Sequence, residues 1–255
     1  MGLRNLYKVF NESRKVTRRR VTLAVTGDSP QAKAIADHLG AQRESRGAEV
    51  ILAVSPAGDT VAFSGARVDH PDELTLPSTD AETLDHRLLP GLARALDKDY
   101  LVAIARAYPA LRRAACEELI RNNARENAFI GALPIPGADM PVMTANQGRM
   151  VLSIAAAHGE NLTMERAREL LGVLAAGLGM RALARQVVKL VPFGGWAASA
   201  AMGYAGTVAM GRATILYFER GAHRLGEREI ATIRERAAEE GKAFVSRWRE
   251  RRGTK

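Results

Sequence analysis

This chain of 255 residues has a single cysteine, few aromatic residues and no long apolar run near its start. Each of these features argues against a class of protein. The single cysteine, Cys116, cannot form an internal disulfide, so no oxidising compartment is indicated. Residues 1–20 contain seven basic residues and no long apolar run, so we expect no secretory signal. The five histidines show no metal-ligand spacing with each other or with Cys116, so we expect no metal and no cofactor.

The positive charge is confined to the two ends of the chain. Of the net charge of +9, residues 1–20 carry +6, residues 21–218 carry −1 and residues 219–255 carry +4. Basic ends suit an anionic membrane surface, nucleic acid or an acidic partner, or they are simply solvated. Because no aromatic residues are interleaved with these charges, we expect no nucleic-acid partner.

The chain divides by pattern into three parts. Residues 1–20 form a basic amphipathic helix whose apolar residues recur at helical spacing: Leu3, Leu6, Tyr7 and Phe10. Such a helix suits an anionic membrane surface, or it packs its apolar stripe on the rest of the protein. Residues 21–79 are a small α/β piece, and residues 80–255 are helical almost throughout.

In the α/β piece, apolar β-branched runs at 21–26 and 49–54 flank a helix from about 30 to 39, and a weaker strand follows at 60–64. A strand, a helix and a strand in succession make a βαβ unit, which implies parallel pairing. Residues 65–80 are rich in Asp, Pro, Ser and Thr and are predicted to be a linker.

After residue 80 the breaks fall at proline and glycine. The predicted helices are 80–97, 98–107, 109–128, 140–157, 163–189, 193–219 and 226–251. The sequence therefore predicts an α+β fold, in which a small βαβ piece precedes a mostly helical domain. That domain contains an Ala/Gly-rich hairpin over about 163–219 and a charged C-terminal helix over about 226–251.

The turn after the first strand matches a degenerate phosphate loop. Such a loop reads Gly, four residues, Gly, Lys, then Ser or Thr; Gly27 and Lys33 are in place, but Ala32 and Ala34 replace the second glycine and the hydroxyl. Pro30 also removes a backbone N–H. The match is either coincidence or a vestige of a G domain. Because Mg²⁺ loses a ligand, we expect no enzyme; the alternative is a nucleotide-binding relative of GTPases in which Lys33 still holds phosphate weakly.

A long uncharged segment, residues 190–211, is the second distinctive feature. Its 22 residues could cross a bilayer, although its small residues keep the mean hydropathy modest. Small residues recur there at every fourth position: Gly195, Ser199, Gly203, Thr207 and Gly211. This small-residue stripe predicts the close approach of another helix, for which we expect the Gly/Ala-rich segment 163–189.

The segment before the stripe also carries a basic cluster, Arg181, Arg185 and Lys189. Lys and Arg at one end of an apolar hairpin favour the cytoplasmic face of a membrane. The alternative is a tight helical hairpin in the core of a soluble domain. Five amides, Asn122, Asn123, Asn127, Asn146 and Gln147, suggest either a buried polar site or, more simply, hydrogen bonds between helices.

A family resemblance covers about residues 88–221. It rests on residues 106–109 (RAYP) with Leu111-Arg112, Leu119-Ile120, Asn127-Ala128, residues 134–139 (PIPGAD), residues 144–147 (TANQ), residues 192–195, Thr207, Gly211 and Tyr217-Phe218. These residues resemble a bacterial domain-of-unknown-function family, numbered six-nine-seven, which follows Era-like GTP-binding domains and occurs in inner-membrane proteins. The resemblance implies a helical, membrane-associated module and brings no established catalytic residues.

We therefore expect a non-enzymatic bacterial protein at the cytoplasmic side of the inner membrane, whose helical domain docks on anionic lipid. Self-association or a protein partner at the small-residue stripe is a further expectation. The alternatives are a soluble cytoplasmic adaptor and a weak nucleotide binder.

Overall fold

The structure, a computed structural model, describes residues 21–133, 139–160, 163–190, 195–223 and 225–253. The chain forms two compact units. The first comprises the chain up to Leu119 together with Ala156–Glu160, and the second comprises Ile120–Ala155 and the chain from Asn161 onward. The sheet-containing unit thus keeps the helices that follow residue 80, although the composition changes there. The predicted helix at 1–20 lies outside the described residues.

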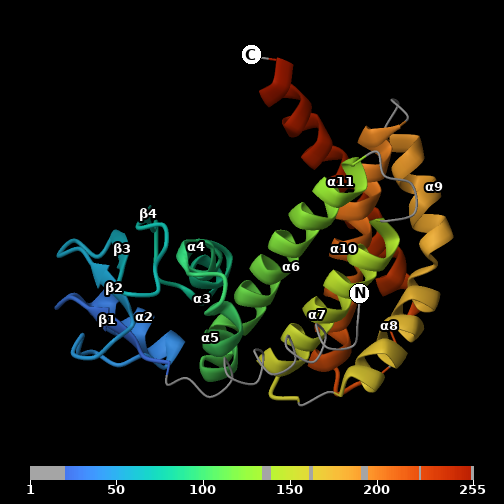
Figure 1. Ribbon diagram of the computed structural model, residues 1–255. Coiled ribbons are helices and arrows are strands. Elements are labelled where there is room, and N and C mark those ends of the chain that lie inside the picture. Colours follow the sequence, from blue (N-terminus) through green and yellow to red (C-terminus); the bar gives the residue numbers. More distant parts are fainter. Residues whose placement is uncertain (1–20, 134–138, 161–162, 191–194, 224, 254–255) are drawn as a thin grey trace. The chain divides into compact units, whose positions relative to one another are not determined.

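The first unit is built on a four-stranded sheet in the order β1-β2-β3-β4 (Figure 1). Its strands are β1 (Leu23–Thr26), β2 (Val50–Val54), β3 (Thr60–Ser64) and β4 (Glu73–Thr75). The parallel pairing of β1 with β2 is confirmed, with Leu23 opposite Val50, and the connection between them is helix α2 (Pro30–Leu39). The other two pairings are antiparallel.

The predicted linker at 65–80 is partly wrong, because it contains β4. The short strand pairs Leu74 with Val61 of β3. Leu74 also packs on a helix, since a Cβ on Gly91 would lie 3.2 Å from its Cδ2. Backbone pairing and this one apolar contact place the strand, and a three-residue strand among polar residues has no pattern to reveal it.

Short helices complete the first unit. They are α3 (Ala81–Thr83), the π-helix η1 (Leu84–Leu88), α4 (Leu89–Ala95) and α5 (Leu101–Ala107), and α6 (Pro109–Ala132) begins here. Asp80 caps α3, with its Oδ1 accepting a hydrogen bond from the Thr83 N–H at 2.8 Å. Hydrogen bonds from Ser78 and Thr83 lower the pKa of Asp80 to about 2.

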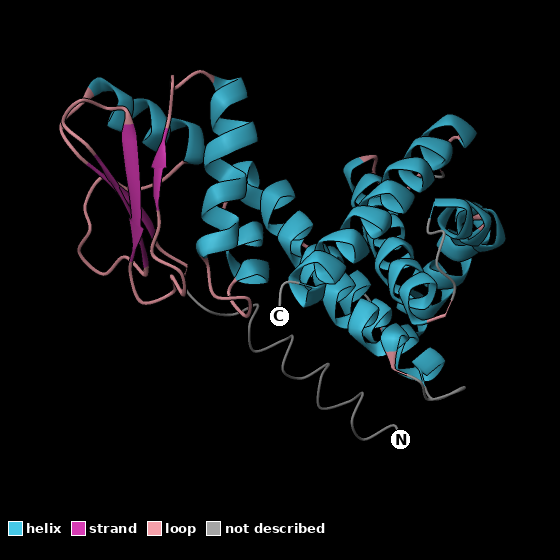
Figure 2. Ribbon diagram, turned by 90° about the horizontal axis from the view of Figure 1, so that it is seen from above, coloured by secondary structure: helices cyan, strands magenta, loops and turns pink. Residues whose placement is uncertain are grey.

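The described part of the second unit consists of helices (Figure 2). They are the rest of α6, α7 (Asp139–Ala157), α8 (Met164–Leu178), α9 (Met180–Leu190), α10 (Trp196–Glu219) and α11 (Glu227–Gly253). The predicted helix 163–189 is in fact two helices, because Gly179 has a φ of +57° and ends α8. The α+β class is confirmed.

Helix α10 forms the core of the second unit. Fifteen of its residues are buried, from Ala197 to Ile215. Among the described helices, none combines the length and the apolar character needed to cross a membrane.

Candidate functional site

The residues that match a degenerate phosphate loop include the first turn of helix α2, as the predicted helix at 30–39 implied. Helix α2 begins at Pro30, and its N-cap Ser29 accepts a hydrogen bond from the Ala32 N–H through Oγ at 3.2 Å. The N–H of Lys33 points to the Ser29 carbonyl oxygen at 3.4 Å, and the Lys33 side chain is exposed. The amides that a phosphate cradle would offer from 32 and 33 are thus engaged in the first turn of the helix.

The fold by itself requires a glycine at position 27. Its φ is +125°, and a Cβ there would lie 2.8 Å from the carbonyl oxygen of Val54 on the neighbouring strand. Its own carbonyl oxygen accepts a hydrogen bond from Nη2 of Arg43. Close approach of β1 to β2 therefore explains this glycine without phosphate.

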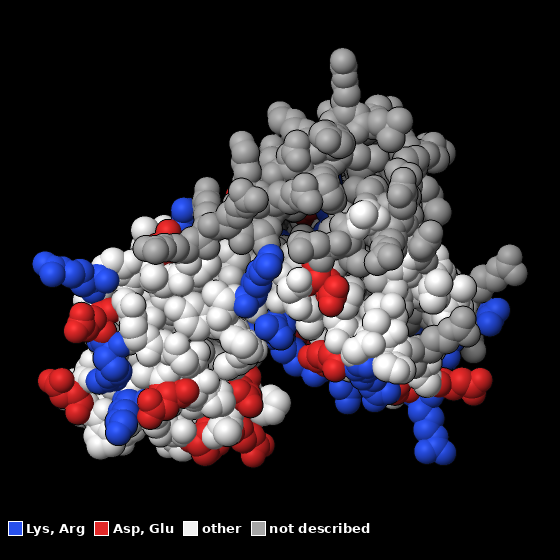
Figure 3. Space-filling view, turned by 90° about the horizontal axis from the view of Figure 1, so that it is seen from below, with Lys and Arg blue, Asp and Glu red and all other residues white. Residues whose placement is uncertain are grey.

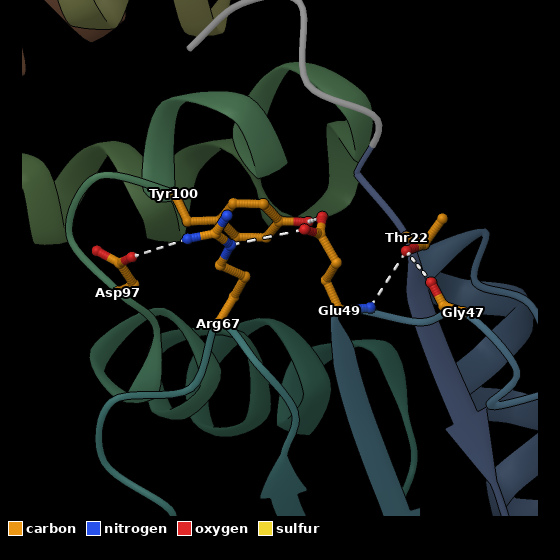
Figure 4. A network of polar contacts seen from close by, with 6 residues as sticks. All are labelled: Thr22, Gly47, Glu49, Arg67, Asp97 and Tyr100. Atoms are coloured by element: carbon orange, nitrogen blue, oxygen red, sulfur yellow. Dashed lines mark hydrogen bonds and ion pairs between the residues drawn. The ribbon is translucent and has the colours of Figure 1, made fainter.

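A polar network occupies the opposite end of the parallel strand pair (Figure 4). The Tyr100 hydroxyl donates to Oε2 of Glu49 at 2.8 Å. Arg67 lies between two carboxylates, 3.6 Å from Glu49 and 3.5 Å from Asp97, with its guanidinium 5.6 Å from the centre of the Tyr100 ring. Burial, together with the hydrogen bond to Glu49, raises the pKa of Tyr100. The network ties the sheet to the start of α5.

The small-residue stripe of α10 divides into a buried and an exposed part. Gly203, Thr207 and Gly211 are buried, whereas Gly195 and Ser199 are exposed. A Cβ on Gly203 would lie 2.6 Å from the carbonyl oxygen of Asn127, and one on Gly211 would lie 2.4 Å from Cγ1 of Ile120. The stripe therefore approaches α6, and not the segment 163–189 for which the composition argued.

A glycine of α6 and a triad of polar side chains also belong to the contact between α6 and α10. A Cβ on Gly131 would lie 2.8 Å from the carbonyl oxygen of Ser199. The amide of Asn127 donates to the Thr207 hydroxyl at 2.8 Å and accepts from Asn146 of α7 at 3.1 Å. Asn127 and Thr207 are both fully buried. The triad joins three helices, as the simpler reading of the amides predicted.

Helix α11 packs on another side of α10. A Cβ on Gly241 would lie 2.7 Å from the carbonyl oxygen of Ala201, and the rings of Tyr204 and Phe244 stack with their centres 4.7 Å apart. Nη1 of Arg212 lies 2.6 Å from Oε1 of Glu240. Glycines on three helices thus let α6, α10 and α11 approach to backbone contact.

At one end of this packing a group of large apolar side chains meets solvent. We call it the aromatic end and define it as Phe129, Leu133, Trp196, Phe244 and Trp248. Phe129, Leu133 and Trp196 are 54%, 56% and 42% exposed. The ring of Trp248 joins the group, with its centre 4.8 Å from Phe129, 5.4 Å from Trp196 and 5.8 Å from Phe244.

Exposed arginines lie on the two helices that carry Phe129 and Trp248. Arg125 lies one turn before Phe129 on α6, and Arg247, Arg249 and Arg251 alternate along the last turns of α11; all four are exposed. Burial raises the pKa of Tyr204 and the Glu240 carboxylate adds to the rise, while Arg125, Arg121 and Arg247 oppose it. Arginines of both α6 and α11 therefore act electrostatically on Tyr204, whose ring stacks on Phe244.

Charge alone does not single out an interface on the face drawn in Figure 3, where basic and acidic side chains lie among one another. Of the predicted basic cluster, Arg185 is exposed on α9, and the side chains of Arg181 and Lys189 lie outside the described residues. The described residues contain no group of three or more His, Cys, Asp or Glu side chains that could hold a metal ion.

Sequence reasoning missed the aromatic end. Its signals were present but local: Phe129 and Leu133 are four residues apart, Trp196 follows a helix break, and Trp248 stands between two arginines. Nothing in a single segment shows that these residues meet, because they come from three separate segments of the chain.

Fold and site together define a two-unit α+β protein, in which a small sheet precedes helices packed around one small-residue helix. A family model for a domain of unknown function, DUF697, matches residues 96–243, and the chain belongs to this family. The resemblance drawn from the sequence is thereby confirmed. Neither the search of curated proteins nor that of solved structures finds a match.

Proposed function

We propose that this protein is a non-catalytic membrane-docking protein, whose aromatic end binds the surface of an anionic bilayer such as the cytoplasmic face of the bacterial inner membrane. The observation that carries the proposal is the joint exposure of Phe129, Leu133 and Trp196 around Trp248. Clusters of exposed large apolar side chains mark interaction surfaces, and Trp in particular favours the boundary between lipid and water.

The exposed arginines of α6 and α11 support lipid over an apolar protein surface. Arg125, Arg247, Arg249 and Arg251 are exposed on α6 and α11, the helices that carry Phe129 and Trp248, so that guanidinium groups can reach lipid phosphates as the rings enter the headgroup region. Each basic side chain close to an anionic surface contributes about 1 kcal/mol. Docking by this surface needs no helix that crosses the bilayer.

The nucleotide-binding alternative draws no support from the geometry of the described loop. Residues 30–34 are helical, and the Ala32 N–H already donates to Ser29 Oγ. The aromatic end, by contrast, exposes the large apolar side chains of Phe129, Leu133 and Trp196 to solvent.

Tryptophan fluorescence tests the proposal directly, because the only two tryptophans of the chain, Trp196 and Trp248, both lie at the aromatic end. Mixing the full chain with vesicles of phosphatidylglycerol and phosphatidylcholine should shift the emission to shorter wavelength and carry the protein into the pellet. Vesicles of phosphatidylcholine alone, or high salt, should weaken both effects, since the arginine contribution is electrostatic.

The variant Phe129→Ser/Leu133→Ser should lower vesicle binding about tenfold, because two exposed apolar contacts are lost. The matched control is Val173→Ser, which removes a side chain that is 55% exposed on α8. Wild-type binding by the double variant, or no spectral shift with anionic vesicles at low salt, would rule the proposal out. Loss of self-association in the double variant without any lipid binding would make the surface an oligomer interface instead.

A further inference from the structure

The second unit contains an apolar groove that the membrane-docking proposal does not use. Its volume is about 440 Å³, within the range of small-molecule pockets. It lies between α8, the C-terminal part of α10 and the start of α11, and its lining is Val173, Leu174, Ala176, Gly177, Leu178, Ala213, Tyr217, Leu225 and Ile230. Tyr217 is 21 residues from Trp196 along α10, which places the groove about 30 Å from the start of that helix and from the aromatic end.

The groove is open because two small residues of α8 leave space at its edge. Gly177 is exposed, and a Cβ there would meet only Cδ1 of Ile230, at 3.9 Å. Ala176 beside it is also exposed. No large side chain fills the space next to Ala176 and Gly177. The apolar lining therefore leaves room for a slender apolar group.

One guanidinium lies close to the groove without being part of its lining. Arg234 follows Ile230 by one turn on α11, and its Nη1 would lie 3.3 Å from a Cβ on Gly179, the residue after the lining residue Leu178. Its Nε is buried and has no hydrogen-bond partner, and within the part of the chain that the structure describes no acidic residue pairs with it. A half-buried cation without a counter-ion favours an anion beside it.

We infer that the groove binds a single-chain amphiphile with an anionic head, its acyl chain along α8 and α10 and its head at Arg234. The lining supplies apolar contact for one chain, and Arg234 supplies the charge complementarity that selects the head. A long-chain fatty acid and a lysophospholipid with a phosphate head share this chemistry. The inference does not depend on membrane docking, because the two sites use opposite ends of α10.

Titration of the full chain with palmitate, with lysophosphatidic acid and with the uncharged alcohol hexadecanol tests the groove by calorimetry or by displacement of a fluorescent fatty acid. Palmitate or lysophosphatidic acid should bind as a monomer in a one-to-one complex, and hexadecanol should bind more weakly. Which of the two anions binds more tightly identifies the head.

The decisive variant is Gly177→Leu, which should abolish binding because its side chain enters the groove. Gly177 has an ordinary helical φ and open space, so the substitution fits the fold. The matched control is Gly172→Leu on the same helix: a Cβ there meets nothing within 4 Å, and Gly172 does not line the groove. It should bind like the wild type.

Arg234→Gln should weaken the binding of both anions several-fold and leave the binding of hexadecanol unchanged. The control is Arg236→Gln, which changes an exposed arginine on the same helix.

Full binding by Gly177→Leu, or no binding of any probe by the wild type, overturns the inference. Loss of stability in Arg234→Gln with unchanged affinity would reduce Arg234 to a structural contact and overturn its role as head-group ligand. Vesicle pelleting should survive Gly177→Leu, so the two proposals can fail separately.

Discussion

Helices α8 and α10 are both rich in glycine and alanine, yet their glycines have opposite environments. In α10, Gly203 and Gly211 lie against α6, where a single added carbon would meet atoms within 2.6 Å. In α8, Gly172 meets nothing within 4 Å and Gly177 borders an open groove. A small-residue face thus shows only that close approach is possible, and the neighbours decide whether it occurs.

The largest effect should come from Gly203→Ala. Its Cβ would meet the carbonyl oxygen of Asn127, a backbone atom that cannot move away without displacing α6. We expect a loss of about 3 kcal/mol in the free energy of unfolding, measured by denaturant titration. An unchanged midpoint would show that α6 and α10 do not pack as closely as the structure has them.

Thr207→Val should cost about 2 kcal/mol, because the Nδ2 of buried Asn127 loses its acceptor while the volume is kept. The matched control is Thr214→Val: this buried hydroxyl donates only to the Met210 carbonyl oxygen of its own helix, so the loss should be smaller. Equal losses in the two variants would mean that the triad adds nothing beyond burial.

Gly211→Ala should cost about 1 to 2 kcal/mol, less than the change at Gly203, because the atoms that a Cβ meets belong to the Ile120 side chain. Adding Ile120→Val should restore part of the loss, since it removes a methyl group at the contact. Additive losses in a double-mutant cycle would contradict direct packing of these two residues.

The smallest change should be a gain. Gly177→Ala adds a Cβ in open space to a helix, and we expect stabilisation by about 0.5 to 1 kcal/mol from the loss of backbone entropy in the unfolded chain. Thermal unfolding of Gly177→Ala and of Gly203→Ala compares the two environments most directly, because the same substitution should raise the midpoint in one and lower it in the other. A destabilised Gly177→Ala would show that α8 is as tightly packed as α10.

Much of the fold was predictable because its signals are local. Pro109 and the βαβ pattern correctly marked a helix start and a parallel strand pair. The strand at 73–75 and the break at Gly179 escaped prediction, because one depends on pairing with β3 and the other on a single left-handed residue. The start of α2 at Pro30 was also expected, whereas the cap that Ser29 gives to its first turn came only from the structure, and the phosphate-loop match of Gly27 and Lys33 stays a prediction.

The sequence by itself determined the α+β class, the helix breaks at proline, the family and the small-residue face of α10, all of which follow from short-range propensity and spacing. Only the tertiary structure decided that α6 fills that face, that Phe129, Trp196 and Trp248 meet at one exposed end, and that α8 borders an open groove. The physical reason is that burial is a property of pairs of surfaces. A glycine, an arginine or a tryptophan has the same intrinsic preferences in either environment, and distant segments of the chain determine which environment it has.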